Sequence, residues 1–80
     1  MDSQELKTVR MVRRLTQKDM AKVIGKTVQM YAIKENKSGF TDDEKILLTE
    51  YLHLTFNQFN RIFYDGKLPF EQIWGYMDGQ

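Results

Sequence analysis

The strongest fold signal in the chain is Leu15–Gln29, which reads LTQKDMAKVIGKTVQ. Thr16 is a good helix N-cap, because its hydroxyl can accept a hydrogen bond from a backbone amide three residues later. Gly25 stands where the chain must turn sharply, since glycine adopts positive φ without steric cost. Thr27 is a second N-cap, and the two caps leave room for only about two helical turns between them. The stretch therefore predicts a short helix, a glycine turn and the start of a second helix, a layout typical of a helix-turn-helix.

Cap and turn signals of the same kind in the rest of the chain predict five helices and no strand. The expected ranges are 3–13, 17–24, 28–36, and two helices that begin after Thr41 and Thr55. Ser3 is the expected cap of the first helix, and Asp65-Gly66 ends the last. Both later threonines open a capping-box pattern, with Glu or Gln three residues on. The expected fold class is all-α: one compact five-helix domain over residues 1–65, followed by a C-terminal extension over residues 66–80.

Apolar residues at helical spacing mark the core of this domain. Two faces stand out, and we expect both to be buried: Met20, Ala21 and Ile24 on the second helix, and Leu47, Leu48, Tyr51 and Leu52 on the fourth. On the first helix, Leu6 and Val9 share a face that Val12 or Arg13 can extend. The aromatic side chains expected in the core are Tyr31, Phe40, Tyr51, Phe59 and Phe63.

The charge is unevenly divided along the chain. The net charge is +1, but residues 1–40 carry nine Lys/Arg against four Asp/Glu, a balance of +5, and residues 41–80 carry three against seven, a balance of −4. A basic half beside an acidic half is compatible with one face for a polyanion and another for a different partner. Two solvated faces of an ordinary protein would give the same pattern, so charge alone does not distinguish a binding face from a solvated one.

Composition excludes several classes of protein. There is no cysteine, so disulfides and thiolate metal sites are absent, which fits a reducing compartment. No apolar run is long enough to span a membrane, and no signal-peptide pattern opens the chain. A cytoplasmic protein with no membrane partner is the expectation.

These caps, turns and apolar positions resemble those of a known family. Residues 6–63, about three quarters of the chain, resemble the Cro/C1-type helix-turn-helix domain, or XRE family, of lambdoid phage repressors and Cro proteins. The matching positions are Leu6, Val9, Arg10, Leu15, Thr16, Gln17, Met20, Ala21, Ile24, Gly25, Thr27, Tyr31, Glu35, Asn36, Leu52, Leu54 and Phe59. The resemblance implies a lambda-repressor-like fold and a transcription regulator, a repressor of phage or mobile-element type, that binds a double-stranded DNA operator.

The resemblance also implies roles for individual residues. The implied DNA base contacts are Thr27, Val28, Gln29 and Ile33, with Gln29 able to pair with adenine and Val28 able to pack on a thymine methyl. The implied phosphate contacts are Gln17, Lys18, Lys26, Asn36 and Lys37. Arg10 and Glu35 match a buried ion pair between the first and third helices.

Four departures from the family pattern concern the structure. An apolar residue is usual where Lys26 and Lys34 stand, and a polar one where Ile33 stands. We expect Lys34 to lay its stem on the core and lift its amine outward. The glycine that often ends the first helix is replaced by Arg14, so that helix is expected to end differently.

The fifth departure concerns function. The loop before the fourth helix often carries several basic residues in the family, whereas here it offers only Lys37 and is followed by Asp42 and Asp43. Carboxylates repel phosphates, so the contact that this loop would make with the DNA backbone is weakened. An alternative function is therefore a protein-interaction module of the same fold, acting as an antirepressor or co-regulator by binding another regulator protein.

The C-terminal extension carries too many apolar residues for a tail that packs against nothing. Phe70, Ile73 and Trp74 follow Pro69 at the spacing of one or two helical turns. We expect them to form a homodimer contact, with packing back onto the fifth helix as the alternative.

Catalytic and metal-binding patterns are missing. No nucleophile–base–acid set and no glycine-rich phosphate loop is present, so we expect no enzyme activity and no cofactor. His53 is a lone histidine, a poor metal ligand set, and a helix C-cap is its expected role. Asp42-Asp43-Glu44 is better explained as a helix start than as a cation site.

Overall fold

Four of the five helices begin directly after a threonine. The hydroxyl oxygens of Thr16, Thr27, Thr41 and Thr55 each accept a hydrogen bond of 3.1 Å from the backbone amide three residues later. At all but Thr27 the third residue returns a bond to the cap amide, which completes a capping box. The expected caps at these four positions are therefore confirmed.

The computed structural model describes residues 1–69, which contain five α-helices and no strand. The helices are α1 (Ser3–Val12), α2 (Gln17–Ile24), α3 (Val28–Lys37), α4 (Asp42–Leu52) and α5 (Phe56–Tyr64). The expected all-α class is thus confirmed. No helix in the described part of the chain is both long enough and apolar enough to cross a bilayer.

The first helix differs from expectation at both ends. Asp2, not Ser3, is its N-cap, and the Asp2 carboxylate accepts a hydrogen bond of 3.0 Å from the Glu5 amide. Aspartate and serine cap equally well, so local sequence could not choose between neighbouring positions. At the other end, the helix ends at Val12 and not at the expected Arg13, which is its C-cap. Val12 is 75% exposed, so neither it nor the exposed Arg13 extends the face of Leu6 and Val9.

Residues in the left-handed helical conformation end α2, α4 and α5, and a residue with positive φ also follows α1. Gly25 ends α2 with φ 69° and ψ 34°, and His53 ends α4 with φ 53°, both as expected. Asp65 ends α5 in the same conformation. Arg14, at the position where glycine is usual in the resembling family, has φ 59° and turns the chain after α1 without a glycine.

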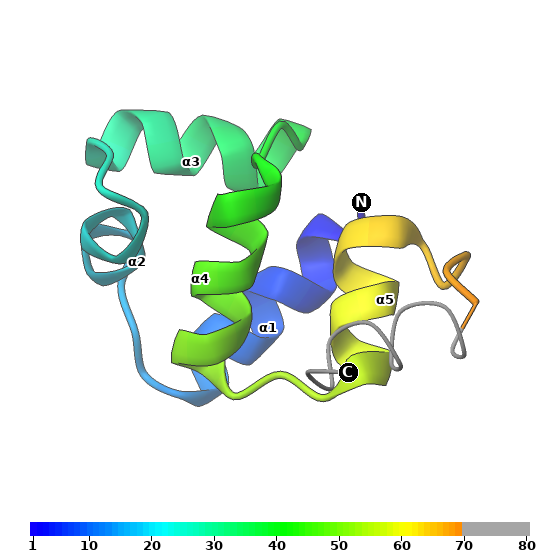
Figure 1. Cartoon of the computed structure of the whole chain (residues 1–80). Coiled ribbons are helices and arrows are strands. Elements are labelled where there is room, and N and C mark those ends of the chain that lie inside the picture. Colours follow the sequence, from blue (N-terminus) through cyan, green and yellow to red (C-terminus); the bar gives the residue numbers. More distant parts are fainter. Residues whose placement is uncertain (70–80) are drawn as a thin grey trace.

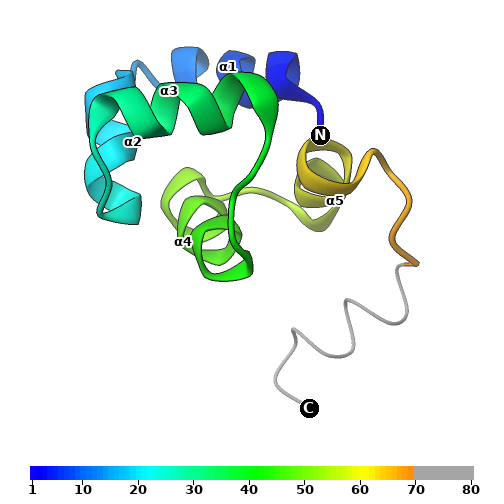
Figure 2. The same ribbon diagram turned by 90° about the horizontal axis from the view of Figure 1, so that it is seen from above.

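The helices pack around a single core. In Figure 1, α3 runs along the upper edge of the molecule, α4 crosses in front and α5 lies to the right. Viewed from above, α1 and α3 lie along one side and α4 on the other (Figure 2). The main helix contacts join α2 to both α3 and α4, and α1 to both α3 and α5.

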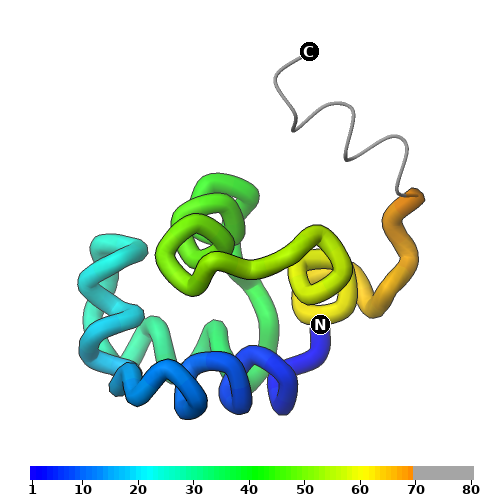
Figure 3. The backbone as a smooth tube through the Cα atoms, turned by 90° about the horizontal axis from the view of Figure 1, so that it is seen from below, coloured from blue at the N-terminus to red at the C-terminus, as the bar shows by residue number. Residues whose placement is uncertain are grey.

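The N-terminus is fastened to α5. The Asp2 amide donates to the Ile62 carbonyl at 2.8 Å, and the Met1 ammonium lies 3.3 Å from the Asp65 carboxylate. Figure 3 shows this end of the chain beside α5. The start of α1 is therefore held against the end of the domain.

The core is built from every helix and from Phe40 in the α3–α4 loop. Its buried apolar members are Leu6, Met20, Ala21, Ile24, Tyr31, Phe40, Leu48, Leu52, Phe59, Ile62 and Phe63. Ring centroids lie 5.8 Å apart between Tyr31 and Phe40, and 5.9 Å apart between Phe40 and Phe63, within the range of favourable aromatic pairs. Four of the five aromatic residues expected in the core are thus confirmed.

The expected buried stripe of α4 is only half right. Leu48 and Leu52 are fully buried, but Leu47 is 42% and Tyr51 45% exposed. The third buried position of α4 is Glu44, one turn before Leu48. Because α4 has apolar residues around most of its circumference, spacing could not identify the inward face, and contacts with the other helices determine it.

The chain after α5 is held by a buried asparagine. The Asn60 side chain accepts a hydrogen bond of 2.9 Å from the Leu68 amide and donates one of 3.1 Å to the Leu68 carbonyl. The expected dimer residues Phe70, Ile73 and Trp74 lie outside the described residues.

Candidate nucleic-acid interface

Helices α2 and α3 and the three residues between them, Gly25–Thr27, form the unit that carries most of the expected site. The apolar face of α2, made by Met20, Ala21 and Ile24, is buried as expected. Tyr31 is the buried apolar residue of α3. The left-handed Gly25 lets α3 start within three residues of the end of α2, so the two helices pack directly against each other.

A buried carboxylate lies at the centre of this unit. Glu35 has no exposed surface, and four hydrogen bonds reach its two oxygens. The Arg10 guanidinium donates from Nε to Oε2 at 2.9 Å and from Nη2 to Oε1 at 3.3 Å. The Tyr31 hydroxyl donates to Oε2 at 2.7 Å, and Gln17 Nε2 donates to Oε1 at 3.1 Å. Glu35 therefore joins α1, α2 and α3 at one point, and the expected Arg10–Glu35 pair is present.

These contacts set the charge states of the cluster. Burial acts to raise the pKa of Glu35, but the hydrogen bonds from Tyr31, Arg10 and Gln17 outweigh it and lower that pKa below its ordinary value. Burial, together with the hydrogen bond to Glu35, raises the pKa of the Tyr31 phenol. At neutral pH the cluster is thus a carboxylate surrounded by donors.

The residues expected to face DNA bases lie on the exposed side of α3. Gln29 is exposed, Ile33 is 59% exposed and Val28 is 37% exposed. Thr27 is exposed too, and its hydroxyl oxygen is already used as the cap of α3. The hydroxyl hydrogen of Thr27 is still able to donate.

The exposed face of α3 carries no carboxylate. Glu35 is the one acidic residue of this helix, and it is buried and paired. Lys26 in the turn and Lys37 in the last turn of α3 are both exposed, and so is Lys18 on α2. Among residues 1–69, no carboxylate lies within salt-bridge distance of these three lysines. Their charges are therefore available to an anion.

Two of the expected phosphate contacts already have partners within the protein. Gln17 is half-buried, and its amide donates to Glu35, a contact that the sequence pattern did not predict. The Asn36 amide donates to the Ala32 carbonyl at 2.8 Å. Each side-chain amide has a second hydrogen, so each can still donate to a phosphate oxygen.

The Lys34 side chain is only 18% exposed, as expected for a stem that lies on the protein, but the expectation for its amine is wrong. Its amine does not rise into solvent but donates to the Gly39 carbonyl and to Glu44 Oε1, both at 3.0 Å. Glu44 is also the capping-box residue of α4, with its Oε1 accepting from the Thr41 amide at 2.9 Å. Burial acts to raise the pKa of Glu44, but the bonds from Thr41 and Lys34 lower it. This pair fixes the loop between α3 and α4.

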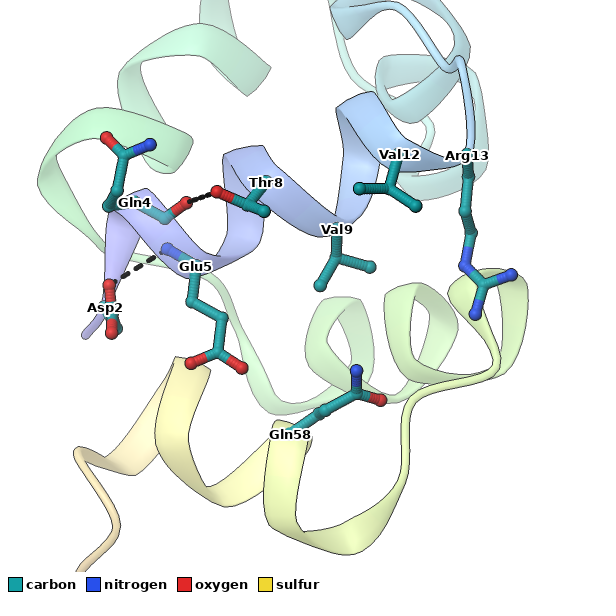
Figure 4. A pocket seen from close by; sticks show the side chains of 8 residues that line it. All are labelled: Asp2, Gln4, Glu5, Thr8, Val9, Val12, Arg13 and Gln58. Atoms are coloured by element: carbon teal, nitrogen blue, oxygen red, sulfur yellow. Dashed lines mark hydrogen bonds between the residues drawn. The ribbon is translucent and has the colours of Figure 1, made fainter.

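A shallow groove elsewhere on the surface contains none of the expected site residues. It lies between α1 and the first turn of α5, where Val9, Val12 and Arg13 approach Gln58 (Figure 4). Two carboxylates, Asp2 and Glu5, lie at its other end. This groove shares no residue with the α2–α3 unit, and it carries two carboxylates.

Comparison of the chain with protein-family models, with curated proteins and with solved structures gives no match. Within residues 1–69, no group of three acidic, histidine or cysteine side chains is placed to hold a metal ion.

Proposed function

We propose that the protein is a sequence-specific DNA-binding transcriptional regulator whose helix α3 enters the major groove. The observation that carries the proposal is the exposed face of α3, on which Gln29 and Ile33 stand outward and no carboxylate is exposed. A helix that follows a short helix and a tight turn is the element that reads bases in helix-turn-helix proteins.

The surrounding charge supports the same proposal. Lys18, Lys26 and Lys37 are exposed on the α2–α3 unit, and lysines that neutralise phosphates supply most of the affinity for duplex DNA. Binding should therefore weaken steeply as salt is added. The exposed Asp42 and Asp43 at the start of α4 oppose this attraction, so we expect few contacts beyond those of α2 and α3.

Operator binding is tested by selection from a random duplex library, followed by footprinting on the DNA that flanks the gene. Gln29→Ala should weaken binding to the selected duplex by about 1–3 kcal/mol, because the adenine contact is lost. The melting temperature should be unchanged, since Gln29 is exposed. Gln4→Ala, which removes an exposed glutamine from α1, is the matched control and should bind normally.

The salt dependence gives a second readout. Lys26→Gln and Lys37→Gln should each reduce the slope of log affinity against log salt by about 1, whatever the duplex sequence. A protein that selects no duplex sequence and shows no salt-sensitive binding would contradict the proposal.

We also propose that the protein acts as a homodimer, since a regulator of this type reads paired half-sites about 10 bp apart. Phe70, Ile73 and Trp74 are the candidate contacts. Light scattering of the full chain and of an Ile73→Ser/Trp74→Ser variant tests this, and an unchanged mass would remove these residues from the interface.

A second candidate function is binding of another regulator protein. It is favoured by three exposed apolar side chains on α4: Ile46 (48%), Leu47 (42%) and Tyr51 (45%). Single surface apolar residues are ordinary, but three on neighbouring positions of one helix are typical of contact surfaces. If Leu47→Ser/Tyr51→Ser leaves DNA binding intact and abolishes regulation in cells, a protein partner on α4 is required.

A further inference from the structure

The outward face of α3 is apolar at its centre. Tyr31 and Glu35 define the buried side of the helix. Because successive helical residues are rotated by about 100°, Ile33 lies almost opposite the midpoint between those two. Ile33 is accordingly 59% exposed, and Met30, one turn earlier, is 44% exposed. Neither packs against the hydrophobic core.

The neighbours of Ile33 on this face are polar or basic. Gln29 lies four residues before it and Lys37 four residues after it, so the three side chains form one row along the helix. Lys26 precedes the helix, and α3 exposes no carboxylate. The face therefore has an apolar side chain, Ile33, at its centre, the Gln29 amide beside it and lysines at both ends. Such a face fits a binding partner that has negative charges along its edges and an apolar group between them.

The major groove of DNA has that composition. Phosphates line its edges, and the thymine C5-methyl is the apolar group that bases present there. We propose, resting on the function proposed above, that Ile33 and Met30 read thymine methyl groups, so that the preferred half-site places thymines beside the adenine contacted by Gln29. Specificity then comes from methyl contacts at Ile33 as well as from hydrogen bonds at Gln29.

A duplex with uracil in place of thymine isolates the methyl group. The protein first selects its preferred sequence from a random duplex library, and that duplex is then made with deoxyuridine at one thymine at a time. Pairing is unchanged, but one methyl is lost. We expect about fourfold weaker binding at each thymine that Ile33 or Met30 contacts, the loss that follows from one buried methyl.

Variants link the effect to named residues. Ile33→Ala should bind the thymine duplex more weakly than the natural chain and should no longer distinguish thymine from uracil at the Ile33 position. Lys37→Gln is the control, because a phosphate contact should weaken binding equally on both duplexes. Ile33 is exposed, so its replacement should leave the melting temperature unchanged.

The outcomes separate the two proposals. If the natural chain selects a sequence but binds thymine and uracil duplexes equally, methyl reading is wrong and the regulator proposal stands. If Ile33→Ala keeps full DNA affinity on both duplexes, Ile33 does not contact a thymine methyl, and methyl reading is again wrong. If no duplex sequence is selected at all, both proposals fail.

Discussion

The Arg10 guanidinium and the Glu35 carboxylate form two hydrogen bonds between α1 and α3, at 2.9 Å and 3.3 Å, with Glu35 fully buried. Arg10 also donates from Nη1 to the Leu15 carbonyl at 3.0 Å, which fixes the chain just before α2. One arginine thus positions both helices of the candidate interface relative to α1. The cluster around Glu35 is the structural support of the exposed face on α3.

Removal of the arginine should be costly. Arg10→Met keeps much of the side-chain volume but leaves the Glu35 carboxylate without its cation, and a buried unpaired charge costs about 3–5 kcal/mol. We expect the free energy of unfolding, measured with urea, to fall by that amount. Adding Glu35→Gln removes the charge and should recover part of the loss. Arg13→Met, at an exposed position, should change stability by about 0.5 kcal/mol or less.

The same cluster should make the fold sensitive to acid. The pKa of Glu35 is lower in the folded protein than its ordinary value, so its ionisation stabilises the fold above the unfolded pKa. That contribution is lost as the pH falls through the folded pKa, so the free energy of unfolding should decrease from about pH 5 downward.

Glu35→Gln separates this group from the others. Its unfolding free energy should fall less steeply between about pH 5 and pH 3, because position 35 no longer titrates. Some slope should remain, since a hydrogen bond from the Thr16 amide lowers the pKa of Asp19 as well. Identical slopes in the natural chain and the variant would contradict a role for Glu35.

Local signals predicted the helix boundaries well. The structure has the expected caps at Thr16, Thr27, Thr41 and Thr55 and the expected positive φ at Gly25. These features could be predicted because they depend on residues only three or four positions apart. The error at Asp2 has the same origin, since two good caps stand side by side at the start of α1.

Tertiary contacts explain the features that the sequence did not predict. The bond from Gln17 to Glu35 joins residues 18 positions apart, and the bond from Lys34 to Glu44 joins two helices across a loop. Tyr31 and Glu35 are four residues apart, a spacing at which helical side chains can meet, so that contact alone had a local signal. The burial of Leu47 and Tyr51 was predicted wrongly, because apolar character alone does not tell which apolar face of α4 packs against the other helices.

Ser38 should be replaceable with a gain in stability. Its φ of 74° and ψ of −176° lie in a region that is essentially restricted to glycine, and a side chain there costs about 1–3 kcal/mol. Glycine loses about 0.5–1 kcal/mol more conformational entropy on folding, so the net effect of Ser38→Gly should be a rise of about 1 kcal/mol in the free energy of unfolding. Thermal unfolding measures this as a shift of roughly 4–8 °C per kcal/mol. Ser38→Ala keeps the Cβ atom and should give no gain, and a gain equal to that of glycine would refute the strain.

Gln17 connects the candidate interface to the buried cluster, and a change of charge there should reveal it. Gln17→Glu places a carboxylate where Nε2 now donates to Glu35 Oε1 at 3.1 Å. Two like charges at that distance repel, so we expect a loss of about 1–3 kcal/mol at pH 7. Gln17→Ala removes one hydrogen bond to a charged group and leaves Glu35 with its other donors, so it should cost less than Gln17→Glu.

The pH dependence of the two variants distinguishes repulsion from a packing defect. In Gln17→Glu, one of the two carboxyl groups can take up a proton as the pH falls, which removes the repulsion. The difference in unfolding free energy between Gln17→Glu and Gln17→Ala should therefore narrow from pH 7 to about pH 4. Gln29→Glu is the matched control, because the same change at an exposed position of α3 should alter stability by about 0.5 kcal/mol or less. A Gln17→Glu variant as stable as Gln17→Ala at pH 7 would show that the side chain has left the Glu35 cluster.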